Sequence, residues 1–230
     1  MREKNNGKSV FAILIKSIGC ISTSKALETL AKIFEKSKEK RSPGRREKWR
    51  KKSVVTMTYS TPCGDLLLGT NSGALIQADW VDGWHEATVR ARLNRYLGDP
   101  AFVSGTDPVL VETASQLDDY FAGKRQTFDL PLRFLGTEFQ TAVWDALRKI
   151  PFGRVTTYGE IAEAIGKPKA MRAVGIAVGE NPFSIIVPCH RVVGRDGSLT
   201  GYGGGFEAKR YLLNLEGIRL PSAVQQEFRF

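Results

Sequence analysis

The stretch TYGEIAEAIGKPKAMRAVGIAV, residues 157–178, decides how the second half of this chain folds. Thr157 followed three residues later by Glu160 is a capping box, which predicts that a helix begins there. A tight turn at 167–169 then leads into a second helix over about 170–178. Two short helices joined by a tight turn form a helix-turn-helix, which is typical of DNA-binding proteins.

The second of these helices carries small side chains, namely Ala170, Ala173, Gly175 and Ala177. Arg172 is the one long cationic side chain among them, so the helix can approach another surface closely. Lys167, Lys169 and Arg172 gather at its N-terminal end, where the helix dipole favours an anion such as phosphate. Tight packing in the core is the alternative explanation for the small residues, but the basic residues favour DNA as the partner.

The part of the chain before this motif shows a different pattern. Strand-like stretches at 58–61, 66–70 and 74–81 are separated by turns, and helical patterns follow at 86–97 and 109–121. A last strand is expected at 126–135, and Gly136 marks a boundary. After it, the capping box Thr137-x-x-Gln140 opens a helix with apolar residues at helical spacing up to Ile150. The first half carries no group of catalytic residues, so we interpret it as a supporting domain in an α+β protein.

The positive charge of the chain is concentrated at its N-terminus. Residues 1–56 hold 16 Lys and Arg against 5 Asp and Glu, whereas residues 57–230 hold 18 against 19. Basic residues exceed acidic ones again over 137–230, by 12 to 9, so we expect any anion-binding face there. We interpret residues 1–56 as a basic extension, disordered or partly helical, or as an artefact of an upstream start. Its apolar run at 10–21 is interrupted by Lys16 and is too short to span a bilayer.

Reactive chemistry is indicated by the segment IVPCHRVV, residues 186–193, in which Cys189 stands beside His190. A thiol attacks as the thiolate, and a nearby imidazole or cation lowers its pKa enough to populate that form. A buried and inert structural cysteine is the alternative. Cys20 and Cys63 give no paired spacing with Cys189, so we expect free thiols and a reducing compartment.

Six motifs occur in the order found in one known family. They are Thr157-Tyr158-Gly159-Glu160-Ile161-Ala162, Arg172-Ala173-Val174-Gly175, Asn181-Pro182, Pro188-Cys189-His190-Arg191-Val192, Gly201-Tyr202-x-Gly204-Gly205 and Leu212-Leu213-x-x-Glu216-Gly217. Together they closely resemble the O6-alkylguanine-DNA alkyltransferases, also called methylated-DNA–protein-cysteine methyltransferases. The resemblance is specific over about residues 137–220 and weaker over 57–136. Gly203 is a departure, because relatives often carry serine there.

The resemblance implies DNA repair in which a methyl group moves from O6 of guanine, and also from O4 of thymine, onto Cys189 in a single turnover. It implies that His190 deprotonates Cys189 through a water, that Glu216 orients His190, that Asn181 braces the turn and that Tyr158 donates to the leaving guanine. DNA and base contacts are implied for Arg172, Ala173, Val192, Tyr202, Gly203 and Gly204. Without the resemblance, Glu216 reads as a solvated helix end, Asn181 as a turn former and Tyr158 as a packing residue.

The fold implied is a small N-terminal α/β domain of the ribonuclease H-like type over 57–136. A mostly helical, winged helix-turn-helix-like domain follows over 137–220, with a tail at 221–230. The implied partner is double-stranded DNA containing O6-alkylguanine or O4-alkylthymine. We expect a monomer that is not membrane-bound and lies in the cytoplasm with the nucleoid, or in the nucleus of a eukaryote. No cofactor is expected, and His85 and His190 without a Cys-x-x-Cys pair predict no metal site.

Three other function classes remain open. A non-catalytic protein that binds alkylated DNA would lack the acceptor cysteine, whereas Cys189 is present. A helix-turn-helix regulator with a redox-sensing cysteine would leave His190, Glu216 and the glycine-rich loop unexplained. A Cys-His hydrolase would need an acyl pocket, for which the sequence gives no indication.

Overall fold

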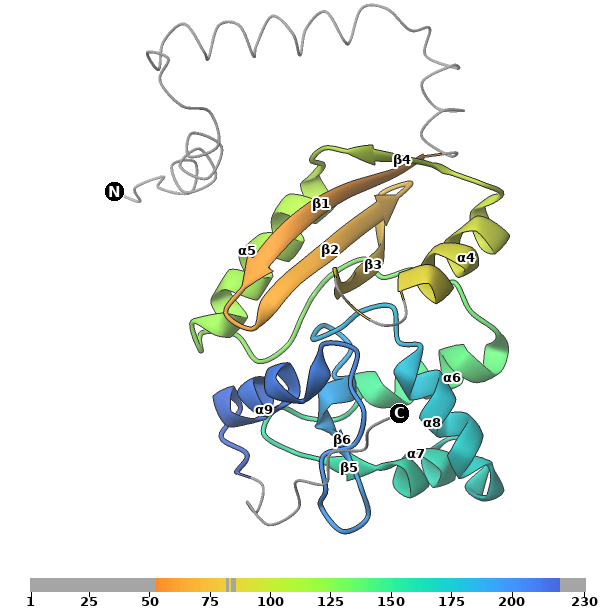
Figure 1. Ribbon diagram of the computed structural model, residues 1–230, viewed down its shortest axis with the longest axis vertical. Helices are drawn as coiled ribbons and strands as arrows, with labels where there is room; N and C mark the ends of the chain where they lie inside the picture. Colours follow the sequence, from red (N-terminus) through yellow and green to blue (C-terminus); the bar gives the residue numbers. More distant parts are fainter. Residues whose placement is uncertain (1–52, 82, 84–85, 220–230) are drawn as a thin grey trace, which may run out of the picture. The chain divides into compact units, whose positions relative to one another are not determined.

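A four-stranded sheet with two helices forms the first half of the described chain (Figure 1). The computed structural model describes residues 53–81, 83 and 86–219. The strands are β1 (Ser53–Thr61), β2 (Gly64–Asn71), β3 (Ala74–Trp80) and β4 (Ala101–Ser104), and the helices are α4 (Glu86–Leu97) and α5 (Pro108–Phe121). The strand order is β3-β2-β1-β4, in which β4 pairs parallel to β1 and the other pairs are antiparallel.

The alternation of side chains along β3 determines which helix covers which face of the sheet. Leu75 belongs to the main apolar core together with Leu117 of α5. Its neighbour Ile76 belongs to a second cluster with Leu93 of α4. The two helices therefore cover opposite faces, as expected for a sheet that is buried on both sides.

Helices dominate the second half. They are α6 (Glu138–Arg148), α7 (Tyr158–Ala164), α8 (Met171–Gly179) and α9 (Gly205–Leu215), with a two-stranded parallel sheet of β5 (Thr156–Thr157) and β6 (Val192–Val193). The capping boxes predicted at Thr137 and Thr157 are both formed. A 3₁₀ turn at Pro168–Ala170 joins α7 to α8, so the predicted helix-turn-helix is confirmed.

The two halves meet along the outer edge of β3. The backbone N–H of Ala78 donates to the carbonyl of Pro182 at 2.8 Å, and the N–H of Ser184 donates to the carbonyl of Ala78 at 2.6 Å. These bonds satisfy polar groups that an edge strand otherwise leaves open. One apolar core runs through both halves and contains Tyr120 from the first and Trp144 from the second. The chain segment that leads to Cys189 is thus fixed to the sheet.

Strand boundaries differ from the sequence expectation in three places. The first strand begins at Ser53 instead of residue 58, because the residues after Ser53 pair with β4. The short strand β4 was not predicted, since four residues show too little alternation. The strand expected at 126–135 is wrong: only Leu132 forms an isolated bridge there. Pro131 has no N–H to donate to a ladder, which explains the lack of continuous pairing.

The predictions for residues 1–52, His85 and the tail at 221–230 lie outside the described residues. Over the ranges that are described, no helix has the length and apolar character needed to cross a membrane.

Candidate active site

Cys189 lies in a tight turn between α8 and β6 and not in a strand. The segment 186–193 reads as strand-like, but a single 3₁₀ turn at Cys189–Arg191 follows Pro188, and only Val192–Val193 pair as β6. Ile185, just before this segment, has φ +71°, a left-handed conformation that β-branched residues rarely adopt. Such strain occurs where the surrounding structure holds a functional turn in place.

Asn181 holds this turn from the inside. Its Oδ1 accepts a hydrogen bond from the backbone N–H of Phe183 at 3.0 Å. Its Nδ2 donates to the carbonyl of Val187 at 2.8 Å and to Sγ of Cys189 at 3.1 Å. Asn181 is only 2 % exposed, so water does not compete for these bonds. The structure thus places Asn181 where a bracing residue is needed, and adds a contact with the sulfur itself.

The Cys189 thiol is protonated at neutral pH. Burial raises its pKa to about 11, although the hydrogen bond from Asn181 and the charge of Lys209 act in the opposite direction. Attack requires the thiolate. The site therefore needs a base that can take the proton of Cys189 when the reaction begins.

His190 is held in the state that a base requires. Its Nε2 lies 2.8 Å from Oε1 of Glu216, and both side chains are fully buried. Burial lowers the pKa of His190, so the ring is neutral at pH 7. Because a carboxylate only accepts hydrogen bonds, the single ring proton lies on Nε2, and Nδ1 is left as an acceptor. Nδ1 is buried and makes no hydrogen bond to any described residue.

The Glu216 carboxylate ties together several parts of the fold. Its Oε1 also accepts from the hydroxyl of Tyr120 at 2.8 Å and from Nη2 of Arg191 at 2.9 Å. Its Oε2 accepts from Nε of Arg191 at 2.8 Å and from the N–H of Gly153 at 3.2 Å. Burial alone would raise the pKa of Glu216, but the hydrogen bonds from His190 and Arg191 outweigh it and lower the pKa to about 2. Glu216 is therefore a buried anion and not a solvated helix end.

A buried lysine lies on the other side of the turn. Lys209 is fully buried, and its Nζ donates to the carbonyl of Val192 at 2.6 Å. It also donates to the carbonyl and Oγ1 of Thr200, at 3.1 Å and 3.2 Å. Oγ1 of Thr200 lies 2.7 Å from the hydroxyl of Tyr158. Burial lowers the pKa of Lys209 to about 8, against the opposite effect of Cys189.

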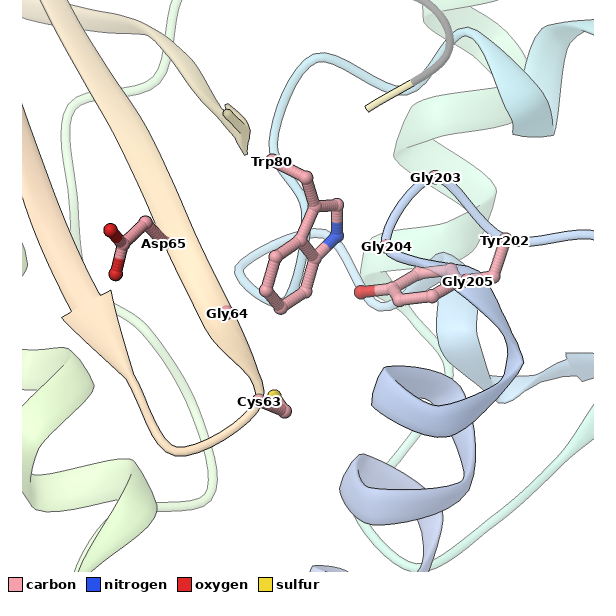
Figure 2. Close-up of a pocket in the computed structure, with 8 residues that line it drawn as sticks. All are labelled: Cys63, Gly64, Asp65, Trp80, Tyr202, Gly203, Gly204 and Gly205. Atoms are coloured by element: carbon pink, nitrogen blue, oxygen red, sulfur yellow. The ribbon is translucent and has the colours of Figure 1, made fainter. Parts of the chain in front are cut away.

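The glycine-rich loop at 201–205 separates two hollows. The hollow beside Cys189, which Asn181, Ser184 and the loop also line, has a volume of only about 10 Å³. That is room for one water at most. On the other side of the loop lies a cavity of about 410 Å³, lined by Cys63, Gly64, Asp65, Trp80 and Tyr202–Gly205 (Figure 2). In this structure the hollow beside Cys189 is therefore too small for a purine base.

Trp80 of β3 packs against this loop. Figure 2 shows its indole standing next to the Tyr202 ring and the backbone of Gly204. The two rings meet edge to face with centroids 6.0 Å apart. A Cβ atom at Gly204 would come within 2.5 Å of the indole, so only glycine fits there without a shift. The first domain thus contacts the loop predicted to bind the base.

Helix α8 exposes Arg172 and part of its small residues, whereas Ala177 is buried in the core. Arg172 and Ala173 are exposed, as is Ile176 at 66 %, whereas Val174 is buried in the core. The exposed side of the helix thus remains free for a partner. Two of the other predicted DNA contacts, Val192 and Tyr202, are buried, with 0% and 7% of their surface exposed. The roles of Val192 and Tyr202 in binding DNA or the base stay predictions.

Sequence reasoning missed Tyr120, Arg191 and Lys209. A lysine on the buried face of α9, one turn before Leu212 and Leu213, is a signal that could have been found, because buried lysines are rare. Arg191 directly follows the Cys-His pair. Tyr120 gave no local signal, since its partner is 96 residues away in the chain.

Comparison with known proteins agrees with this geometry. Residues 54–134 match the family model for the ribonuclease-like domain of 6-O-methylguanine DNA methyltransferase, and residues 138–218 match that for its DNA-binding domain. These matches confirm the predicted α+β fold, with a ribonuclease-like domain before a helical DNA-binding domain.

Individual relatives cover most of the described chain. The methylated-DNA–protein-cysteine methyltransferase of Mycobacterium tuberculosis is 45% identical over 165 residues, which are 72% of this chain and 93% of the relative. The constitutive enzyme of that name from Bacillus subtilis is 44% identical, covering 70% and 94%. The crystal structure of M. tuberculosis OGT in complex with DNA is similar with a TM-score of 0.61 and 42% identity, over 74% of this chain and 96% of that one. The chain therefore belongs to the family of the methylated-DNA–protein-cysteine methyltransferases.

Proposed function

We propose that this protein repairs DNA by taking the alkyl group from O6 of an alkylated guanine onto Cys189, once per molecule. The observation that carries the proposal is the buried Cys189 thiol, hydrogen-bonded by Asn181 and followed in the chain by a histidine whose proton Glu216 fixes on Nε2. Family membership supports it, because the relatives are named for this reaction.

The reaction is a displacement at the alkyl carbon. Nδ1 of His190 takes the proton of Cys189 through a water, and the thiolate forms an S–C bond as the bond between carbon and O6 of guanine breaks. The departing guanine leaves with the electron pair, and Tyr158 donates its hydroxyl proton or a hydrogen bond to it. Burial raises the pKa of Tyr158, so its hydroxyl is a neutral donor at neutral pH. No group in the site cleaves the resulting thioether, so each molecule acts once.

The target atom lies inside the duplex, so the base has to turn out of the stack, at a cost of roughly a few kcal/mol. Arg172 and Ala173, exposed on α8, are placed to enter a groove, with Arg172 filling the gap left in the duplex. The loop residues Tyr202, Gly203 and Gly204 then border the flipped base. Similarity to a relative crystallised with DNA supports this partner. We extend the substrates to O4-alkylthymine and propose that the protein acts as a monomer.

The test is mass spectrometry of the protein after mixing with duplex DNA that carries one O6-methylguanine. We expect one added methyl group, located on the peptide of Cys189. Cys63→Ala is the matched control and should still accept the methyl group, whereas Cys189→Ala should not. An unchanged mass with lesion DNA still bound would mean that the protein recognises damage without repairing it.

A further inference from the structure

The ammonium group of Lys209 is fixed on all sides by backbone and side-chain acceptors. An ammonium has three N–H donors, and Lys209 has three partners: the carbonyl of Val192, the carbonyl of Thr200 and Oγ1 of Thr200. The side chain is fully buried. A buried ammonium costs free energy unless its donors are satisfied, and here all three are.

The hydroxyl proton of Thr200 has two acceptors within reach. Oγ1 of Thr200 accepts from Lys209, which leaves its own proton for one of two acceptors. The carbonyl of Val192 lies 3.4 Å away and already holds Lys209, whereas the hydroxyl oxygen of Tyr158 lies at 2.7 Å. Either oxygen of the 2.7 Å contact can donate, and the alternative acceptor of Thr200 lies farther away, at 3.4 Å. With Thr200 as the donor, its hydrogen bond ends on the Tyr158 oxygen. The proton of Tyr158 is then not used by Thr200.

We propose that Thr200, held by Lys209, is a positioning residue that directs the hydroxyl proton of Tyr158 towards the departing base. This inference rests on the proposed function. As the bond between carbon and O6 breaks, the electron pair leaves with guanine and the Tyr158 proton moves to the base. Thr200 then stabilises the negative charge on the Tyr158 oxygen by its own hydrogen bond, with the cation of Lys209 behind it.

The same cation also acts on the other end of the reaction. The charge of Lys209 lowers the pKa of Cys189 against the larger effect of burial. One buried cation thus stabilises the attacking thiolate directly and the leaving base through Thr200. Thr200 separates the effect on the leaving base from the effect on the thiolate, because it contacts Tyr158, and its hydrogen bonds to described residues do not include Cys189.

Two methyl donors distinguish an effect of Thr200 on the leaving group from an effect on Cys189. Transfer from O6-methylguanine in duplex DNA needs a proton or hydrogen bond for its leaving group. Methyl iodide gives the same thioether on Cys189, but its leaving group, iodide, needs no proton. Rates of methyl addition to Cys189 are measured by peptide mass spectrometry for wild type, Thr200→Val, Thr200→Ser and the exposed control Thr127→Val.

We expect Thr200→Val to slow transfer from DNA by about tenfold, the effect of one lost hydrogen bond. Thr200→Ser should restore most of the rate, since it keeps the hydroxyl. Thr127→Val should match wild type. All four proteins should react equally with methyl iodide and bind lesion DNA equally.

Two results would overturn the proposal. A normal rate of transfer from DNA by Thr200→Val means that the hydroxyl directs nothing. Equal slowing with both methyl donors means that Thr200 acts on Cys189 or on the fold, and not through Tyr158. A wild-type protein that reacts with methyl iodide but never with DNA would instead refute the proposed function.

A double-mutant cycle distinguishes an effect of Thr200 through Tyr158 from an effect of Thr200→Val on the fold. In a Tyr158→Phe background, Thr200→Ser and Thr200→Val should transfer from DNA at the same rate, because the group they position is absent. A difference between them in that background that equals the difference in wild type would also contradict the proposal.

Discussion

Replacing Glu216 by glutamine should strongly destabilise the fold, although the two side chains have the same shape. All partners of the carboxylate are donors: Tyr120, His190, Arg191 and the backbone of Gly153. A glutamine amide replaces one acceptor oxygen with an NH₂ group, which is itself a donor. Whichever way the amide turns, at least two donors then face another donor. The guanidinium of Arg191 also loses its buried counter-charge.

Two estimates give the size of the expected loss of folding free energy. Removing one partner of a buried ion pair costs about 3–5 kcal/mol. A pKa held at about 2 instead of the usual 4.5 corresponds to about 3 kcal/mol of stability at neutral pH. We therefore expect Glu216→Gln to lower the free energy of unfolding by about 3 kcal/mol or more.

The assay is urea unfolding of wild type and Glu216→Gln, with Glu207→Gln as the control. Glu207 lies on the same helix and pairs with Arg210, but its side chain is 87 % exposed, so its loss should cost less than about 1 kcal/mol. The Glu216 contribution should be full above pH 4.5 and should disappear as the pH falls towards about 2, because the folded pKa is the lower one. A loss below about 1 kcal/mol at neutral pH would refute this reasoning.

Three further outcomes are expected. Asn181→Ala should slow methyl transfer by about tenfold or more, since the bond to Sγ of Cys189 is lost; an unchanged single-turnover rate would contradict this. Gly204→Ala should also slow transfer, because the added methyl group collides with Trp80, and Trp80→Leu should restore the rate if the collision is the cause. Arg172→Ala should weaken binding to lesion DNA, measured by fluorescence anisotropy, while leaving the reaction of Cys189 with methyl iodide unchanged; equal loss of both would place Arg172 elsewhere in the mechanism.

Local signals predicted the helical half well. The capping boxes at Thr137 and Thr157 act within four residues, so the sequence alone shows where those helices begin. The apolar alternation at 126–135 misled the strand prediction, because partly buried side chains at Phe128 and Leu130 pack on the core without a ladder partner. The alternation of apolar and polar residues indicates which side chains are buried. Whether a strand forms depends also on a neighbouring strand for its backbone hydrogen bonds, which the local pattern does not specify.

The sequence predicted the site residues that belong to recognisable motifs, but not those that reach the site through contacts between distant parts of the chain. Cys189, His190, Asn181 and Glu216 come together as the family resemblance implied, although their roles stay predictions. The bond between Tyr120 and Glu216 joins the two halves of the chain and leaves no local trace. Lys209, in contrast, could have been predicted, because a lysine on the apolar face of a helix is unusual.

The narrow hollow beside Cys189 means that a molecule which has acted differs physically from one that has not. The hollow holds about 10 Å³, and a methyl group on Sγ has to share it with Asn181 and Ser184. Overfilling a packed interior typically costs about 1–3 kcal/mol. Reacted molecules would therefore have a lower free energy of unfolding than unreacted ones, and the urea midpoint of the population would record how many of its molecules have met a lesion.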